Sequence, residues 1–392
     1  MKRLILISIL SLSLAACEQI DHNGPEIRDR VNDIATSEVA KMLSCLPLEE
    51  PQLREVHDAV KASSENGYDE EYTMEDLFTA PGAGVGDKAT KVARRVYSTP
   101  LKDLINNYLS STKAGSSTFT AKDLEKSGLQ LYWPWYDNWD GKSLPAITFD
   151  PGDGSTSNVA YKMTRGIDGV IQVKEIVVDE SYASKNPVWI VNTNDDAGFT
   201  SVEVLRKQLE GGEVLIGGKK KARHTKADSD TSGIKTLVLK EFTMLRNYDS
   251  WLCGGSEFFV KCGSLENFTA TTEEEMLAYD PSITDFVICV QRKDVGIPQT
   301  VNAILVSEWT NQLERCAFLI LEDDGGTWTD WTAEGEVKIK SKTYGFKLKI
   351  PIRSRDDIVW RGTLSSKYFT KYSGQKGGFG DVEVVFDMLE SD

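Results

Sequence analysis

The sequence predicts a multidomain α+β protein with an N-terminal helical region, a small β-rich domain and a C-terminal antiparallel β-sandwich. Its 392 residues suffice for two or three domains, and 40% hydrophobic with 27% charged residues is an ordinary globular mixture. Apolar residues follow a helical period up to about residue 126 and a strand period after it. Because helical segments do not alternate with the later strands, we do not expect a parallel βαβ sheet.

The first residues predict a secretory signal. Lys2 and Arg3 precede the apolar residues 4–16, a stretch too short to span a membrane as a helix. The string Leu14-Ala15-Ala16-Cys17 resembles the lipobox of bacterial envelope lipoproteins. The resemblance implies cleavage before Cys17, a lipid on its sulfur, and anchoring to a bilayer of the cell envelope, which we expect to be the outer membrane. The alternative is an ordinary secretory signal, residues 1–16, with an incidental cysteine.

Residues 17–25 are expected to be the lipidated tether, and residues 26–126 a helical domain of four or five helices. Thr99 and Pro100 suit the start of the clearest helix, whose apolar residues lie on one face. These residues are Leu101, Leu104, Ile105, Tyr108 and Leu109. Residues 81–88 are rich in glycine but lack the pattern of a phosphate-binding loop, so we expect a connection between helices.

Residues 127–216 are expected to form the small β-rich domain. Short segments rich in β-branched and aromatic residues are separated by turn residues: LQLYWPW, PAITF, NVAYKMT, VIQVKEIVV and PVWIVN. Residues 217–233 have almost no apolar side chains and mixed charge, which predicts a charged linker or loop.

Residues 234–392 are expected to form the β-sandwich from about eight strands. In one of them, Phe346, Leu348 and Ile350 alternate with Lys347 and Lys349, as in a strand with one face in water. The run CAFLIL is apolar on both faces, which is typical of a strand inside a sandwich. Cys253 and Cys262 are close enough in sequence to close a small disulfide loop, although their pairing stays open.

An aromatic cluster is the first candidate ligand site. Tyr132, Trp133, Trp135 and Trp139 lie within eight residues, and rings exposed on a β surface could stack on the flat faces of sugars. The alternative is that these rings fill the core or the joint with the helices, as large aromatic side chains commonly do.

An acidic group is the second candidate. Asp323 and Asp324 follow one apolar strand and Asp356 and Asp357 follow another, with Asp249 and Glu257 in a third segment. A sandwich gathers such loops at one end, and calcium prefers several oxygen ligands. The arrangement is similar to the acidic loops of C2-type sandwiches, and this resemblance implies a calcium site. The alternative is that Asp and Gly form turns and that Asp356 and Asp357 pair with Arg353, Arg355 or Arg361.

The function predicted is non-enzymatic. A net charge of −15 argues against nucleic acid as a partner, and the three histidines, His22, His57 and His224, lie in no recognisable catalytic motif. We therefore expect a cell-envelope lipoprotein that binds a glycan, a peptide or an envelope protein, or takes part in assembly, and requires no cofactor apart from a possible calcium ion. The alternative is a hydrolase of polysaccharide or peptide that acts through carboxylates, which needs no histidine.

Overall fold

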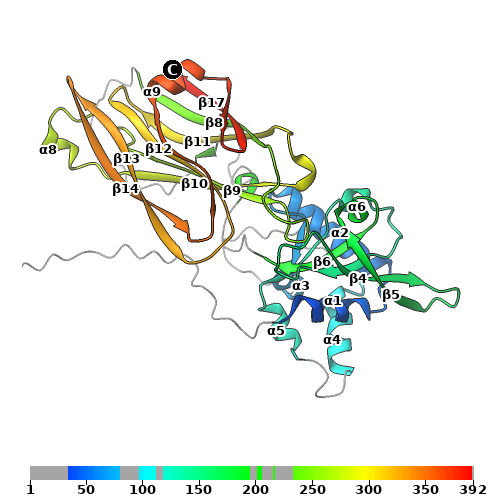
Figure 1. The fold of residues 1–392 in the computed structure, drawn as a ribbon. Helices are drawn as coiled ribbons and strands as arrows, with labels where there is room; N and C mark the ends of the chain where they lie inside the picture. The colour runs from blue at the N-terminus through cyan, green and yellow to red at the C-terminus, as the bar shows by residue number, and fades with distance from the viewer. Residues whose placement is uncertain are drawn as a thin grey trace, which may run out of the picture.

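The computed structural model describes two lobes that lie side by side (Figure 1). The described residues are 34–79, 97–111, 118–194, 201–204, 215–216 and 233–390. We call the described residues within 34–194 the N-terminal lobe, and residues 233–390 together with 215–216 the C-terminal lobe. The expected signal peptide, Cys17, the tether and all of the expected linker except Gly233 lie outside the described residues.

The N-terminal lobe is a mixed sheet packed against helices. Its strands are β1 (Glu71–Thr73), β2 (Leu129–Tyr132), β3 (Ala146–Phe149), β4 (Ser157–Arg165), β5 (Ile171–Asp179) and β6 (Val188–Thr193). They lie in the order β1-β2-β6-β3-β4-β5, in which only the β3–β6 pair is parallel among the described strands. The helices are α1 (Thr36–Ser44), α2 (Glu50–Glu65), α3 (Met74–Phe78), α4 (Leu101–Ser111), α5 (Ala121–Glu125), α6 (Glu180–Ala183) and the 3-10 turn η1 (Tyr136–Asn138).

Local sequence explains where the long helix α2 begins. The Glu49 side chain accepts from the backbone at Gln52 while the Gln52 side chain accepts from the Glu49 backbone, and Pro51 occupies the first turn. The start of α4 is capped from a distance, because the Glu55 carboxylate of α2 accepts the Leu101 amide at 2.6 Å. Glu55 is thereby buried at the contact between these two helices.

The helices and the sheet of the N-terminal lobe share one hydrophobic core. Val56 and Val60 of α2 and Ile105 of α4 belong to the same cluster of buried side chains as Leu131 and Trp189 of the sheet. The boundary expected between residues 126 and 127 therefore falls inside a common core. A sheet buries its apolar face against another layer, and here that layer is the helices.

The C-terminal lobe is a β-sandwich. One sheet has the order β10-β9-β12-β13-β14, with β15 also paired to β12, and the other has the order β16-β17-β8-β11-β7. The strands are β7 (Leu215–Ile216), β8 (Lys235–Met244), β9 (Ser256–Ser264), β10 (Ser282–Val290), β11 (Gln299–Trp309), β12 (Leu313–Glu322), β13 (Trp328–Ile339), β14 (Lys342–Arg353), β15 (Asp357–Ser365), β16 (Lys376–Phe379) and β17 (Val382–Glu390). Short helices α8 (Glu273–Met276) and α9 (Ser366–Tyr372) and the turn η2 (Arg292–Asp294) connect them.

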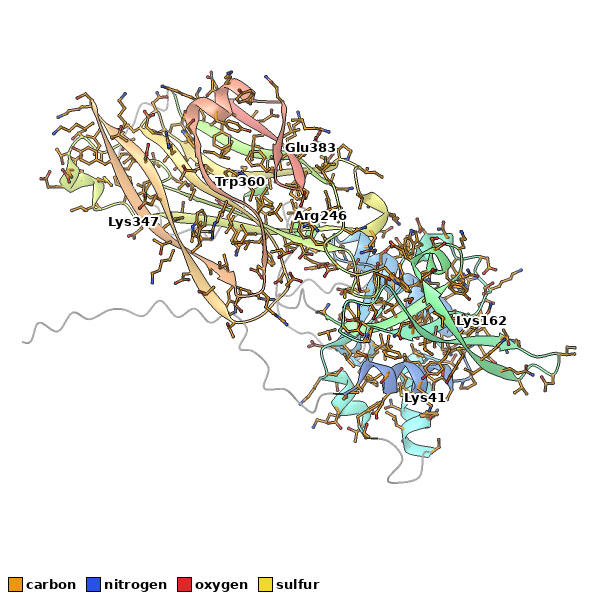
Figure 2. The ribbon with its side chains drawn as sticks, in the orientation of Figure 1. Lys41, Lys162, Arg246, Lys347, Trp360 and Glu383 are labelled. Carbon is orange, nitrogen blue, oxygen red and sulfur yellow. The ribbon has the colours of Figure 1, made fainter. Side chains whose placement is uncertain are left out.

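The two sheets enclose one large apolar core. Phe242 of β8 and Phe386 of β17 pack in the same cluster as Phe258 of β9 and Phe318 of β12. The α+β class and the antiparallel, sandwich-like C-terminal half are thus confirmed. The predicted alternation in β14 is also confirmed, since Ile350 is fully buried while Lys347 and Lys349 are exposed (Figure 2 labels Lys347). Among the described helices, none is both long and apolar enough to cross a membrane.

Polar contacts join the two lobes. Arg292 of η2 pairs with Glu180 of α6 at 3.1 Å, and Lys293 contacts Asp137 at 3.1 Å and Glu70 at 3.4 Å. The indole of Trp251, in the loop after β8, donates to the carbonyl oxygen of Thr156 in the other lobe and is fully buried. These contacts bury charged groups between the lobes. Among them is Glu70, whose pKa is raised by burial.

We expect Glu70 to make the stability of the fold depend on pH. Burial raises the pKa of Glu70 from 4.5 to about 8, so the folded chain keeps a proton that the unfolded chain has released. From roughly pH 4.5 to pH 8 the free energy of unfolding should therefore fall by about 1.4 kcal/mol per pH unit through this group. Glu70→Gln should lose less stability than the wild type between pH 5 and pH 8 in chemical denaturation. Glu273→Gln, at an exposed position of α8, is the control. If the free energy of unfolding had the same slope against pH in all three proteins, the raised pKa of Glu70 would be contradicted.

Candidate metal centre

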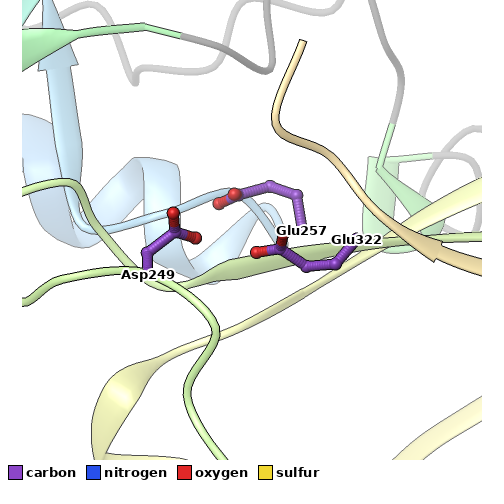
Figure 3. A group of neighbouring side chains, drawn as sticks. All are labelled: Asp249, Glu257 and Glu322. Atoms are coloured by element: carbon purple, nitrogen blue, oxygen red, sulfur yellow. The ribbon is translucent and has the colours of Figure 1, made fainter. Parts of the chain in front are cut away.

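Three carboxylates from three strand ends meet beside the lobe junction (Figure 3). Asp249 lies in the loop after β8, Glu257 is the second residue of β9, and Glu322 is the last residue of β12. One oxygen from each carboxylate lies within 4.8 Å of the others. We call these residues the acidic trio.

The pairing of β9 with β12 brings two members of the acidic trio together. Glu322 is the cross-strand partner of Phe258, so Glu257 lies one residue along, and the Asp323 amide donates to the Glu257 carbonyl oxygen at 3.0 Å. The loop of Asp249 is tied to the start of β9 because the Tyr248 amide donates to the hydroxyl of Ser256 at 3.2 Å. Backbone structure therefore holds all three carboxylates in place.

Burial makes the charge of the acidic trio costly. Glu322 is 1% exposed and Glu257 is 5% exposed, while Asp249 is partly buried. Burial raises the pKa of Asp249, whose side chain shares a hydrogen bond with Glu322. Two carboxyl groups can be hydrogen-bonded only when one of them carries a proton.

Further acids surround the acidic trio. Asp324 and Asp357 are exposed, and both lie close enough to interact electrostatically with Asp249. Desolvation and the charges of Asp249 and Asp357 raise the pKa of Asp324 to about 6. Asp150 of the N-terminal lobe also acts on Asp249 and accepts the thiol of Cys253 at 3.7 Å. Negative charge thus extends from the buried trio to solvent through Asp324 and Asp357.

The hydroxyl of Tyr132 and the side-chain oxygen of Asn192 are among the buried polar atoms that have no hydrogen-bond partner within the described residues. The Tyr132 hydroxyl is fully buried, and the charges of Asp69, Glu70 and Glu257 all act on it. The Asn192 amide donates to the Leu252 carbonyl oxygen at 3.1 Å. Buried groups of this kind call for an ordered water or an ion nearby.

The donor chemistry of the acidic trio suits a hard cation. All of its ligand atoms are carboxylate oxygens, which calcium and magnesium prefer, whereas zinc sites use mostly nitrogen and sulfur. Calcium takes six to eight oxygen ligands in adaptable geometry, so oxygens of Asp324, Asp357 and water could complete its shell.

The structure separates the four predicted calcium ligands into two pairs. Asp324 and Asp357 lie beside the acidic trio, but Asp323 and Asp356 are held by Arg353. The Arg353 guanidinium donates to both Asp323 oxygens at 3.0 and 3.2 Å, and the Arg353 amide donates to Asp356 at 2.7 Å. The alternative stated above paired Asp356 and Asp357 with an arginine, whereas here the Arg353 guanidinium pairs with Asp323 and Asp356 accepts the Arg353 backbone amide. Glu322 directly precedes Asp323 in the sequence but is not among the predicted ligands, and its approach to Asp249 is a tertiary contact that only the folded structure shows.

The predicted aromatic residues lie mostly in the interior. Tyr132 and Trp133 are 0% and 1% exposed, and Trp135 and Trp139 are partly buried. The Trp139 ring packs against His57 with the ring centroids 5.3 Å apart. Two of the four rings therefore have no face open to a sugar, and this burial favours the alternative that the cluster fills the core and the joint with the helices.

The possible disulfide between Cys253 and Cys262 is not formed. Cys262 is fully buried on β9 and is hydrogen-bonded to Cys316 on the neighbouring strand β12. The Cys253 thiol instead donates to Asp150.

Comparison of the chain with protein-family models, with characterised proteins and with solved structures finds no match. A function for the chain therefore has to be argued from the geometry of its own residues.

We expect Arg353 to be essential for stability and not for cation binding. Its partner Asp323 is 2% exposed, so Arg353→Met would leave a buried carboxylate without its counter-charge and lower the free energy of unfolding by about 3–5 kcal/mol. Arg355→Met, at an exposed position two residues away, should change it by less than about 0.5 kcal/mol. Urea denaturation of both variants measures the difference. Equal effects would contradict the assignment of Asp323 to Arg353.

Proposed function

We propose that this chain is a lipid-anchored binding or assembly protein of the bacterial cell envelope that holds a calcium ion in the acidic trio, beside the junction of its two lobes, and is not an enzyme. The observation that carries the calcium proposal is the approach of three carboxylates from separate strand ends to within 4.8 Å. The lipobox-like string Leu14-Ala15-Ala16-Cys17 supports the location in the envelope.

Charge supports a cation in the acidic trio. Removing an ionised carboxylate from water costs several kcal/mol, and two members of the trio are almost fully buried. A divalent cation bound by these carboxylate oxygens would offset that cost.

The position of the acidic trio supports a structural role for the cation. Asp150 belongs to the N-terminal lobe and Asp249 to the C-terminal lobe, and Arg292 ties the Asp249 carbonyl oxygen, at 2.9 Å, to Glu180 of the N-terminal lobe. A cation bound to Asp249 would therefore stiffen the loop through which the lobes contact each other. We infer that the ion fixes the orientation in which the lobes present their surfaces to a partner.

Burial argues against the alternative of a hydrolase. A pair of carboxylates about 5–5.5 Å apart is the spacing of retaining glycoside hydrolases, so distance alone would permit that chemistry. A catalytic pair must flank a sugar or peptide bond, however, and Glu257 and Glu322 are 5% and 1% exposed. Neither carboxylate can reach a polymer from where it lies.

We expect calcium to raise the melting temperature of the chain. A ligand that binds only the folded state raises the free energy of unfolding by about 2.7 kcal/mol when its concentration is a hundred times its dissociation constant. Glu257→Gln and Glu322→Gln should fold and lose the calcium shift, because an amide keeps the shape but not the charge. Asp356→Asn should keep the shift, since Asp356 is held by Arg353. A shift that survives in both glutamine variants, or no shift in the wild type, would sink the proposal.

Calcium affinity is expected to fall as the pH falls through about 6. Asp324 has a pKa of about 6 and that of Asp249 is raised, so protons compete with the cation in this range. Isothermal titration at pH 5, 6 and 7.5 measures the affinity. Asp324→Asn should bind more weakly at pH 7.5 and lose less affinity on acidification, whereas Asp103→Asn, on the exposed side of α4, should behave as the wild type. An affinity that does not change with pH would contradict this account.

A further inference from the structure

The hairpin of β4 and β5 ends in aliphatic side chains that no other described residue covers. The hairpin extends away from the rest of the N-terminal lobe (Figure 1). At its turn Ile167 is fully exposed, and Val170 and Val173 beside it are 58% and 44% exposed. We call these three residues the apolar tip. Aliphatic side chains gathered in water at the end of a protruding hairpin are unfavourable there unless another surface receives them.

Basic side chains surround the apolar tip. Lys162 of β4 and Lys174 of β5 are cross-strand partners, and Arg165 is the last residue of β4. We call these three residues the basic collar. Like charges directly opposite each other destabilise a strand pair. Within the described residues no salt bridge joins either lysine to a carboxylate: Lys162 lies over the ring of Tyr182, and Arg165 donates to two backbone carbonyl oxygens. The basic collar therefore keeps its positive charge.

The charge at the end of the hairpin is opposite to that of the whole chain. Between residues 162 and 174, three basic side chains and one acid, Asp168, give 3 − 1 = +2, whereas the chain carries −15. The Asp168 carboxylate turns back to the hairpin, where it accepts the Val170 amide at 3.1 Å. Charges more than about 8 Å away are largely screened at physiological salt. A surface that approaches the apolar tip therefore meets mainly the basic collar.

The chemistry of this hairpin end matches an anionic phospholipid surface. Aliphatic side chains enter the boundary of the acyl chains, while lysine and arginine extend their charged ends to the phosphates. A protein partner fits less well, because a stable interface takes about 800 Å² from each side and commonly uses aromatic anchors. The apolar tip has no aromatic ring, and a bilayer needs no matching shape.

The position of the hairpin allows it to reach the bilayer that would hold Cys17. The described chain begins over the base of the hairpin, since the Thr36 hydroxyl donates to the carbonyl oxygen of Asp150, directly after the strand that pairs with β4. From Cys17 to Ile34 there are 34 − 17 = 17 residue steps, which span up to roughly 56 Å when extended. The nine residues of β4 span only roughly 30 Å.

We propose that the β4–β5 hairpin is a second membrane contact, in which the apolar tip enters an anionic phospholipid surface and the basic collar binds the phosphates. The proposal rests on the lipid anchor of the proposed function for the presence of a bilayer. The contact itself needs neither acyl chains nor calcium. Together with the anchor it gives the N-terminal lobe two attachments, and stable membrane binding generally needs more than one.

The test is co-sedimentation of the chain from residue 18 to residue 392 with phosphatidylcholine vesicles that contain phosphatidylglycerol, in the presence of a calcium chelator. This chain keeps every described residue and lacks Cys17, so its binding reports the hairpin and not the anchor. We expect binding that weakens as the salt concentration rises, and weaker binding to vesicles of phosphatidylcholine alone.

Substitutions separate the two parts of the contact. Ile167→Ser should lower the partition constant by about tenfold, and Lys174→Gln should lower it by about fivefold. Leu277→Ser, at an 82% exposed apolar residue after α8, and Lys347→Gln, at an exposed lysine of β14, are the matched controls and should bind as the wild type does. Circular dichroism checks that all four variants are folded.

The outcome is independent of the anchor. A wild type that does not bind the phosphatidylglycerol vesicles, or an Ile167→Ser variant that binds them as tightly as the wild type, would overturn the hairpin proposal. The mass of the N-terminal peptide of the full chain, isolated from bacterial membranes, shows separately whether Cys17 is acylated. Either proposal can therefore fail without the other.

Discussion

The burial of carboxylates between and beside the two lobes is the constraint on which the rest of this structure depends. Asp69, Glu70, Glu71, Glu257 and Glu322 are all 5% exposed or less. A buried charge must be met by a donor, a cation or a proton, and each solution is present here. Asp69 accepts the Gly255 amide across the junction, Glu71 accepts the Asn194 side chain, and Glu70 has Lys293 and a pKa raised by burial. The acidic trio gathers three carboxylates whose oxygens lie within 4.8 Å of one another, and a divalent cation is the compensation we propose for it.

This constraint connects the architecture to the proposed role. The sandwich supplies the segments that converge at the acidic trio, and Asp150 of the N-terminal lobe lies close enough to act on Asp249. Gly254 and Gly255 illustrate how closely the two lobes approach, since a Cβ atom at either position would meet the Asp69 carboxylate. A protein that must present two lobes in one orientation gains from an ion at this position.

Patterns in the sequence predicted the features that belong to short segments. They predicted few of the features that depend on contacts between distant parts of the chain. Alternation in β14, the strand content of the C-terminal half and the acidic loops after β12 and before β15 are properties of short segments. The common core of α2, α4 and the first sheet could not be predicted, because helical periodicity shows that a face is apolar but not which layer covers it.

The residues of the candidate site were likewise only partly predictable from the sequence. Glu322, Asp323 and Asp324 are consecutive in the sequence, but only the folded structure shows that Glu322 lies with Asp249 while Asp323 pairs with Arg353.

The most direct test of the central claim is a crystal structure of the chain grown with calcium chloride at neutral pH. The account predicts one strong density peak ligated by oxygens of Asp249, Glu257 and Glu322 at about 2.3–2.6 Å, with Asp323 still paired to Arg353. Asp249 and Glu322 hydrogen-bonded to each other with no peak between them, or a calcium ion bound at Asp323 and Asp356, would contradict it.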